Sequence, residues 1–332
     1  MQLRRLAPVP TLSIITYHHV AHDDPDYVYD PETVDASPAQ FRRQMELIAR
    51  YCTPIGIDDL IRAVDGAPLP KNPVMVTFDD GYLSCHETSL PILRAVGVRA
   101  TFFISTSFIN ERRLYWWERI ALLVSGSKLS KATIEYPERL EIELGDPHLR
   151  GVLNALVKNT PSLDVERFLV ELRSALEVEW NAKIEADYAN GLIMTWDQIR
   201  GLARAGMDVE SHGRRHRVLQ TLDDATLEDE LTGSRLDVEA QLGRPCRAIA
   251  YPVGRRISEA RIRKAITLAG YRIGLSNMSG VNRFWPVQLR TLLPHDPLDM
   301  RRHATDRRMS DGMYLTQVAI PNLAYINNYN KD

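Results

Sequence analysis

The sequence has few cysteines, no long apolar run and no excess of basic residues. Its three cysteines, Cys52, Cys85 and Cys246, are far apart and include no C-x-x-C pair, which excludes an evident zinc knuckle and a disulfide framework. No stretch approaches the roughly 18 apolar residues of a membrane-spanning helix. The formal net charge of −2 argues against nucleic-acid binding, which relies on excess Lys and Arg. We therefore expect no transmembrane segment and no nucleic-acid partner.

The N-terminus also lacks the features of a signal peptide. Arg4 and Arg5 are followed only by a short apolar stretch that contains Pro8 and Pro10. If Met1 is the true start, we expect a cytoplasmic protein.

Short apolar segments alternate with helical patterns along most of the chain. The expected strands are residues 12–17, 74–78, 100–104, 207–211, 248–251, 271–275 and 289–293. The clearest helices are residues 38–49, 227–242 and 258–269, where apolar residues recur every three or four positions. Such alternation predicts parallel strands, and seven strands can close into a barrel. The predicted fold class is α/β, a distorted (β/α)7-type barrel with a mostly helical insertion.

Residues 111–192 break this alternation and form the predicted insertion. Helical patterns dominate there, most strongly over residues 165–180. We find no convincing strand pattern with a second strand to pair with. We expect one domain over residues 1–332, with a core of residues 10–110 and 193–300 around the insertion.

The strong insertion helix has an apolar face that must be buried. It can lie against the barrel, so that the insertion roofs the active-site mouth, or against a second copy in a homo-oligomer. Glu118 and Arg119, at the start of the insertion, are interpreted as surface charge, and residues 314–325 as a weak edge strand.

Polar side chains follow several expected strands, where the active sites of parallel α/β folds lie. Asp79 and Asp80 directly follow one apolar strand, and His212 follows another, with His216 four residues later. Two histidines at this spacing can reach one ion, and with a carboxylate they suit zinc, cobalt or nickel. Successive strand residues point to opposite sides, so one aspartate can bind the ion while the other accepts a proton. Taken singly, an Asp-Asp-Gly turn and two solvated histidines are common; the interpretation rests on the set.

Five short segments can be compared with known families. They are residues 17–20 (YHHV), 77–81 (TFDDG), 211–216 (SHGRRH), 250–254 (AYPVG) and 270–272 (GYR). In order and spacing they resemble the polysaccharide deacetylases (carbohydrate esterase family four, the chitooligosaccharide deacetylase homology domain). The variant that they resemble most is that of the poly-N-acetylglucosamine deacetylases.

This resemblance implies a metal-dependent N-deacetylase that acts on an amino sugar. It implies that Asp79 is the general base and that the ligands of a divalent ion, zinc first among the candidates, are Asp80, His212 and His216. It also implies that the backbone N–H of Tyr251 donates to the oxyanion.

The sequence departs from the family pattern at three places. Gly213 stands where the family has Ser or Thr, so we expect the loop to lack one hydrogen bond. The family's arginine that orients the base has no clear counterpart, and Arg290 is the candidate. His295 lies near the place of the general acid, while His18 and His19 are further candidates to line the site.

Several functions stay open at this point. The sugar can be a lipid- or nucleotide-linked precursor or an oligosaccharide. Relatives that act on a non-carbohydrate amide, a formamide or a cyclic imide are alternatives, as is an inactive sugar-binding module. The retained Asp79 weighs against a decayed site. It would also be unexplained in an iron oxygenase that binds its metal with two histidines and one carboxylate.

Overall fold

The computed structural model describes residues 11–22, 24, 27–280, 282–284 and 296–319. The strand expected at residues 289–293 lies outside these residues. Among the described helices, none combines the length and the apolar character that crossing a membrane requires.

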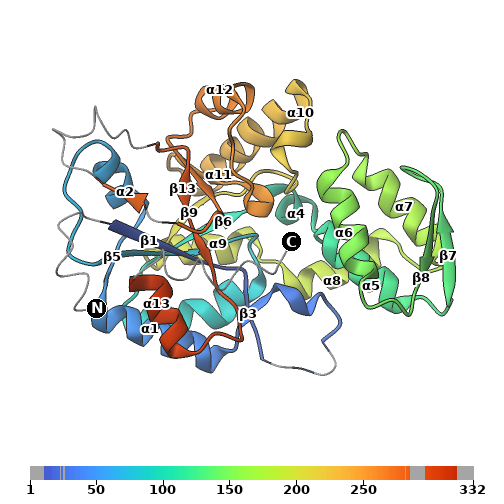
Figure 1. Cartoon of the computed structure of the whole chain (residues 1–332), viewed down its shortest axis with the longest axis horizontal. Coiled ribbons are helices and arrows are strands. Elements are labelled where there is room, and N and C mark those ends of the chain that lie inside the picture. The colour runs from blue at the N-terminus through green and yellow to red at the C-terminus, as the bar shows by residue number, and fades with distance from the viewer. Residues whose placement is uncertain (1–10, 23, 25–26, 281, 285–295, 320–332) are drawn as a thin grey trace.

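Parallel strands form a sheet that nearly closes on itself (Figure 1). In sheet order they are β1 (Thr11–Tyr17), β5 (Pro73–Phe78), β6 (Ala100–Ile104), β9 (Asp208–Ser211), β10 (Ala248–Ala250) and β11 (Ile273–Ser276). β13 (Met300–Arg301) pairs with β11 and β14 (His303–Ala304) pairs with β1, so one short segment bridges the two edges. The predicted distorted (β/α)7-type barrel is confirmed, with β13 and β14 sharing the seventh position.

Smaller strands and the helices complete the barrel. β4 (Thr53–Pro54) pairs with β5, β12 (Asn282–Arg283) pairs with β1, and β2 (His19–Val20) pairs with β3 (Val34–Ala36). The flanking helices are α1 (Pro38–Tyr51), α2 (Ile57–Val64), α3 (Leu90–Val96), α4 (Thr106–Glu111), α9 (Trp196–Arg204), α10 (Asp224–Glu228), α11 (Ser234–Leu242), α12 (Ala260–Leu268) and α13 (Asp311–Ala319). The expected edge strand at residues 314–325 is wrong for its described part, which belongs to α13.

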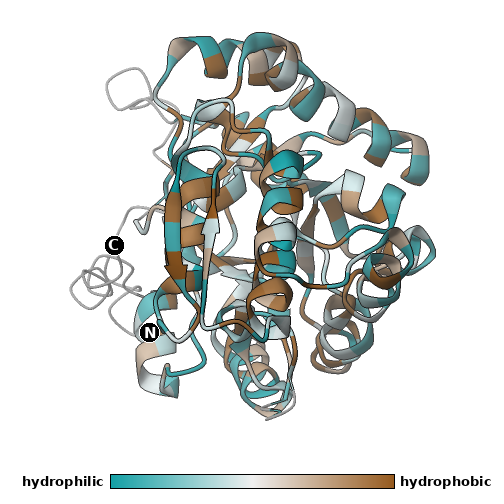
Figure 2. Ribbon diagram, turned by 90° about the vertical axis from the view of Figure 1, so that its right-hand side faces the viewer, coloured by the Kyte–Doolittle hydropathy of each residue, from teal (hydrophilic) through white to brown (hydrophobic). Residues whose placement is uncertain are grey.

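Successive side chains along the strands point to opposite faces of the sheet and so contribute to two separate apolar cores. Met75 lies in the cluster that fills the barrel interior, with Leu12, Ile14 and Phe103, whereas Val76 packs in the larger cluster outside the barrel. Hydrophobic residues are concentrated on these central strands (Figure 2). Because Asp79 is four residues after Met75, its side chain points to the same interior side of the sheet.

The insertion enters the chain between β6 and β9, which are neighbours in the sheet. It consists of α5 (Trp116–Gly126), β7 (Lys131–Ile134), β8 (Leu140–Glu143), α6 (Leu149–Asn159), α7 (Val165–Ala175) and α8 (Ala182–Leu192), drawn in green at one end of Figure 1. The antiparallel β7–β8 pair contradicts the expectation that the insertion has no paired strand. Each strand has only four residues and buries one, Ile134 or Ile142, so the sequence carries little alternation.

The apolar face of α7 is buried inside the insertion. Phe168, Leu169 and Leu172 are at most 1% exposed, and α7 packs against α5 and β7. This face therefore needs neither the barrel nor a second copy of the chain to cover it.

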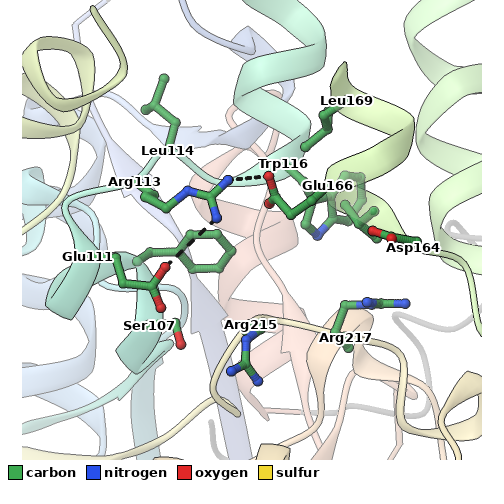
Figure 3. A pocket seen from close by; sticks show the side chains of 12 residues that line it. Ser107, Glu111, Arg113, Leu114, Trp116, Asp164, Glu166, Leu169, Arg215 and Arg217 are labelled. Carbon is green, nitrogen blue, oxygen red and sulfur yellow. Dashed lines mark hydrogen bonds and ion pairs between the residues drawn. The ribbon is translucent and has the colours of Figure 1, made fainter. Parts of the chain in front are cut away.

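Charged residues fasten the insertion to the barrel. Arg113, which follows α4, forms ion pairs with Glu111 and with Glu166 of α7, beside a small cavity of about 140 Å³ (Figure 3). The interpretation of Glu118 and Arg119 as surface charge is wrong, because both are buried. Glu118 accepts the Asp30 N–H and the Tyr82 hydroxyl, and Arg119 pairs with Glu166; these partners come from distant segments.

Candidate metal centre and active-site mouth

Three side chains with metal-ligand chemistry converge at the carboxyl ends of β5 and β9. Nε2 of His212 and Nε2 of His216 each lie 3.4 Å from Oδ1 of Asp80. One ligand atom from each residue lies within 4.8 Å of the others. In the described part of the chain, Oδ1 of Asp80 is buried without a hydrogen-bond partner. A buried carboxylate oxygen that faces two imidazole nitrogens fits a divalent cation, which would satisfy it.

His212 is oriented so that one nitrogen is free. Its Nδ1 lies 2.9 Å from the carbonyl oxygen of Ala250, which can only accept, so Nδ1 carries the proton and Nε2 can bind a cation. Its backbone N–H donates to the Ile104 carbonyl at 2.8 Å, and the Ser105 hydroxyl donates to its carbonyl at 3.1 Å. His212 is thus held in place through both its ring and its backbone.

The backbone is left-handed at Asp80 and His216, with φ values of 72° and 52°. Such a conformation costs about 1–3 kcal/mol in a residue other than glycine and is often found at functional sites. The Tyr115 hydroxyl donates to the Asp80 carbonyl at 3.0 Å, and the Trp117 ring lies 4.6 Å from the His216 ring. The start of the insertion therefore supports two of the three ligand residues.

Asp79 is held by Arg302, which lies between β13 and β14. Its Oδ1 and Oδ2 each accept a hydrogen bond of 2.7 Å, from Nη1 and Nη2 respectively, and both side chains are fully buried. Burial raises the pKa of Asp79, but the positive charges of Arg302 and His212 outweigh it and bring the pKa to about 2. Asp79 is therefore ionised at neutral pH, with Oδ2 at 3.8 Å from Nε2 of His212.

The loop that carries His216 is supported by Glu230. Its Oε1 accepts hydrogen bonds from three backbone N–H groups, those of Arg214 (2.9 Å), Arg215 (2.7 Å) and Arg217 (3.3 Å). Gly213 begins the loop with φ 75°, and a Cβ there would lie 2.8 Å from the same Oε1. The glycine that replaces the family's Ser or Thr thus makes room for a carboxylate that holds the loop.

Tyr251 does not have a free N–H, contrary to expectation. Its N–H donates to the Leu275 carbonyl at 2.8 Å, because β10 and β11 pair at this register, and its hydroxyl donates to the Leu298 carbonyl at 2.8 Å. Val253, two residues later, lines the active-site mouth. Its φ of 61° is rare for a β-branched residue, which marks a constrained turn at this wall.

The site opens into a cavity of about 870 Å³, which we call the mouth. Asp79, Asp80, His212 and His216 line it, and residues 147–159 of the insertion form one wall. Trp116 and Trp117 are buried, at 4% and 7% exposed, and they also contribute to the lining.

His18 lines the mouth together with Asp35. Its Nδ1 lies 3.0 Å from Oδ2 of Asp35. Burial lowers the pKa of His18, but the carboxylates of Asp35, Asp80 and Asp79 together raise it to about 9. His19 instead bonds to the Ser84 hydroxyl at 2.8 Å, and burial lowers its pKa to about 4.

Two candidates from the sequence, Arg290 and His295, lie outside the described residues and stay predictions. The arginine that binds Asp79 in the described part is Arg302, which sequence reasoning missed. Its signal was weak, since residues 301–302 are one of several adjacent arginine pairs in the chain. Glu230 was missed as well, because nothing in a helical pattern marks a carboxylate that turns toward a loop.

Comparison with known proteins gives one family and a set of similar folds. A family profile described as polysaccharide deacetylase matches residues 66–274, more than half of the chain. No curated protein matches the chain at a significant level.

Among solved structures, the Streptococcus pyogenes deacetylase PplD in complex with acetate has a TM-score of 0.61 and 16% identity, covering 94% of this chain and 100% of that one. A de-N-acetylase from Aggregatibacter actinomycetemcomitans has a TM-score of 0.57 and 15% identity (93% and 100% covered). IcaB from Ammonifex degensii has a TM-score of 0.55 and 15% identity (93% and 96% covered). At such identities these likenesses concern the fold.

The profile match, the barrel and the converging side chains agree with one another. Members of this family are hydrolases of carbon–nitrogen bonds that remove acetyl groups from acetylated sugars. The chain belongs to the polysaccharide deacetylase family.

Proposed function

We propose that this enzyme removes an N-acetyl group from an amino sugar with the help of a divalent ion held by Asp80, His212 and His216. The observation that carries the proposal is the buried Oδ1 of Asp80, which has no hydrogen-bond partner among the described residues and faces two imidazole nitrogens beside the ionised Asp79. When bound, such an ion polarises the acetamide carbonyl and lowers the pKa of water. Zinc suits the two nitrogens and one oxygen, and cobalt or nickel can replace it.

The chain's own residues have separate roles in this proposal. Asp79 accepts the proton of the attacking water, and Arg302 keeps Asp79 ionised and oriented. The N–H of Val253 replaces that of Tyr251 as the donor to the oxyanion, because Val253 lines the mouth. His18, protonated through Asp35, gives a proton to the leaving amine. His295 stays a candidate for that last role.

The buried Asp79–Arg302 pair weighs against the inactive sugar-binding module. Burying two charges is costly, and a binding module would gain nothing from this pair. A single domain with an appended insertion, and a cytoplasmic location, stay part of the proposal.

The test measures acetate release and metal content together. The purified enzyme is expected to release acetate from acetylated amino sugars and to stop when a chelator removes the metal. Asp79→Asn is expected to keep the metal and lose ~10²–10⁴-fold of its turnover, because Asn cannot accept the proton. Asp80→Asn is expected to lose the metal. If Asp79→Asn also removes the metal, the roles of the two aspartates are wrongly assigned, and chelator-resistant turnover refutes metal dependence.

A further inference from the structure

α6 presents two different faces. One is apolar and buried within the insertion, and it consists of Leu149, Leu153 and Val157. The other lines the mouth, and it includes the small residues Gly151 and Ala155, one turn apart, beside the larger Arg150 and Val152. Asn154 and Lys158, also one turn apart, line the same cavity. A helix of the insertion thus presents polar side chains, Asn154 and Lys158 among them, to the mouth.

Most charged groups that line the mouth already have a partner. The ion pairs are Asp79 with Arg302 (2.7 Å), Asp35 with His18 (3.0 Å) and Asp30 with Arg150 (3.5 Å). Asp80 belongs to the metal triad, and Glu32 is exposed at the rim. The carboxylates of the inner mouth are therefore satisfied within the chain or by the proposed ion.

Lys158 is different. In the described part of the chain, its ammonium forms no ion pair and no hydrogen bond, although the residue is half-buried. Burial lowers its pKa, while the charges of Asp30 and Asp80 act on it only from a distance. One turn earlier, the buried Oδ1 of Asn154 has no hydrogen-bond partner among the described residues. Asn159 accepts a hydrogen bond from Arg255, so Lys158 lies where α6 meets the loop that carries Val253.

We propose that Lys158 binds an anionic group of the substrate, so that the enzyme selects N-acetylated amino sugars that carry a phosphate or a carboxylate. The inference rests on the proposed function and names its substrate class. A partly desolvated ammonium is stabilised by an opposite charge, and the described residues supply none at ion-pair distance. A substrate oxyanion bound in the mouth supplies the missing charge.

The experiment compares charged and neutral sugars on the full-length, metal-loaded enzyme. Acetate release is measured with UDP-N-acetylglucosamine, with N-acetylmuramic acid and with a neutral N-acetylglucosamine oligosaccharide. The variants are Lys158→Met, which removes the charge, and Lys158→Arg, which keeps it. Lys183→Met is the matched control, since Lys183 is an exposed lysine of α8 that pairs with Asp187 at 2.7 Å.

For the wild type we expect a higher kcat/KM with at least one charged sugar than with the neutral one. Lys158→Met is expected to lower the preference, kcat/KM for the charged sugar divided by kcat/KM for the neutral one, about tenfold or more. The change is expected mainly in KM for the charged sugar and is equivalent to about 1.4 kcal/mol. Lys158→Arg is expected to restore most of the preference, and Lys183→Met to keep the wild-type ratio. A loss with the diphosphate alone or with the carboxylate alone identifies which anion is bound. An unchanged ratio, or equal losses with charged and neutral sugars, overturns the inference.

Equilibrium binding to Asp79→Asn separates this inference from the proposed function. If no sugar is deacetylated but a charged sugar binds and Lys158→Met weakens its binding about tenfold, the deacetylase proposal fails and the anion site stands. If acetate is released but neither binding nor turnover of charged sugars depends on Lys158, the anion site fails alone. Absence of both binding and release refutes both.

Discussion

Asp79 and Asp80 are neighbours in the chain but have opposite electrostatic environments. Two hydrogen bonds from Arg302 keep Asp79 ionised, whereas burial raises the pKa of Asp80, whose Oδ1 has no hydrogen-bond donor in the described part of the chain. Both carboxylates follow the end of β5 and approach Nε2 of His212, but the left-handed backbone at Asp80 turns its side chain toward His216, and Arg302 binds Asp79. The different roles proposed for the two carboxylates follow from this geometry.

His18 is the residue at which proton donation can be tested. His18→Gln is expected to lower turnover of an acetylated amino sugar by ~10²–10⁴-fold, because the amine leaves poorly without a proton. The loss with 4-nitrophenyl acetate is expected to be much smaller, because nitrophenolate leaves unprotonated. His19→Gln is the control, since His19 bonds to Ser84 and does not line the mouth. Equal losses of amide and ester hydrolysis in His18→Gln contradict the assignment.

The elements that carry the ligands differ in how they are held. His212 follows directly from β9 and is fixed by neighbouring strands, whereas His216 lies on a loop that depends on Glu230. The loop is short and left-handed at both Gly213 and His216. Its geometry therefore depends on contacts from the π-helical segment Asp229–Gly233 that contains Glu230.

Gly213→Ala tests this dependence. The new Cβ would lie 2.8 Å from Oε1 of Glu230 in a left-handed backbone, so Glu230 or the loop must move. We expect metal affinity to fall about 10–100-fold, as for other groups that orient ligands, with the circular dichroism spectrum retained. Gly145→Ala is the control, because a Cβ at Gly145 would have no atom within 4 Å apart from those of its chain neighbours. Unchanged metal affinity in Gly213→Ala would show that the loop does not need this arrangement.

At the scale of the whole molecule, Glu118 joins three parts of the chain. It lies on α5 of the insertion and accepts hydrogen bonds from the Asp30 N–H at 2.7 Å and from the Tyr82 hydroxyl at 2.9 Å. Burial raises its pKa to about 8, so the folded chain holds this proton at pH values where the unfolded chain releases it. The unfolded carboxyl has a pKa of about 4.3.

The resulting pH dependence has a definite sign. Between about pH 4.3 and pH 8 the folded state binds more protons at Glu118, so this residue's contribution to stability is present below pH 4.3 and falls as pH rises. Glu118→Gln, which cannot ionise, is expected to lose less stability than the wild type over this range, by a few kcal/mol. Urea unfolding with chelator present, at several pH values, measures the difference. The exposed Glu87→Gln serves as control; equal slopes in wild type and Glu118→Gln contradict the prediction.

The sequence alone determined the barrel class and the four residues at its centre. Strand periodicity and the residues that follow each strand are local signals, so Asp79, Asp80, His212 and His216 could be placed at one edge before any contact was known. The short β7–β8 pair carried too little alternation to be predicted, and the expected cytoplasmic location stays a prediction.

Only the tertiary structure decided which groups these residues meet. Arg302 reaches Asp79 across 223 positions because β13 and β14 close the barrel there. The register of β10 and β11 engages the Tyr251 N–H, and distant partners bury Glu118. A local pattern shows which way a side chain points along its own strand or helix. Its partner depends on how distant parts of the chain pack together, and the packing of the insertion beside the barrel placed Lys158 at the mouth.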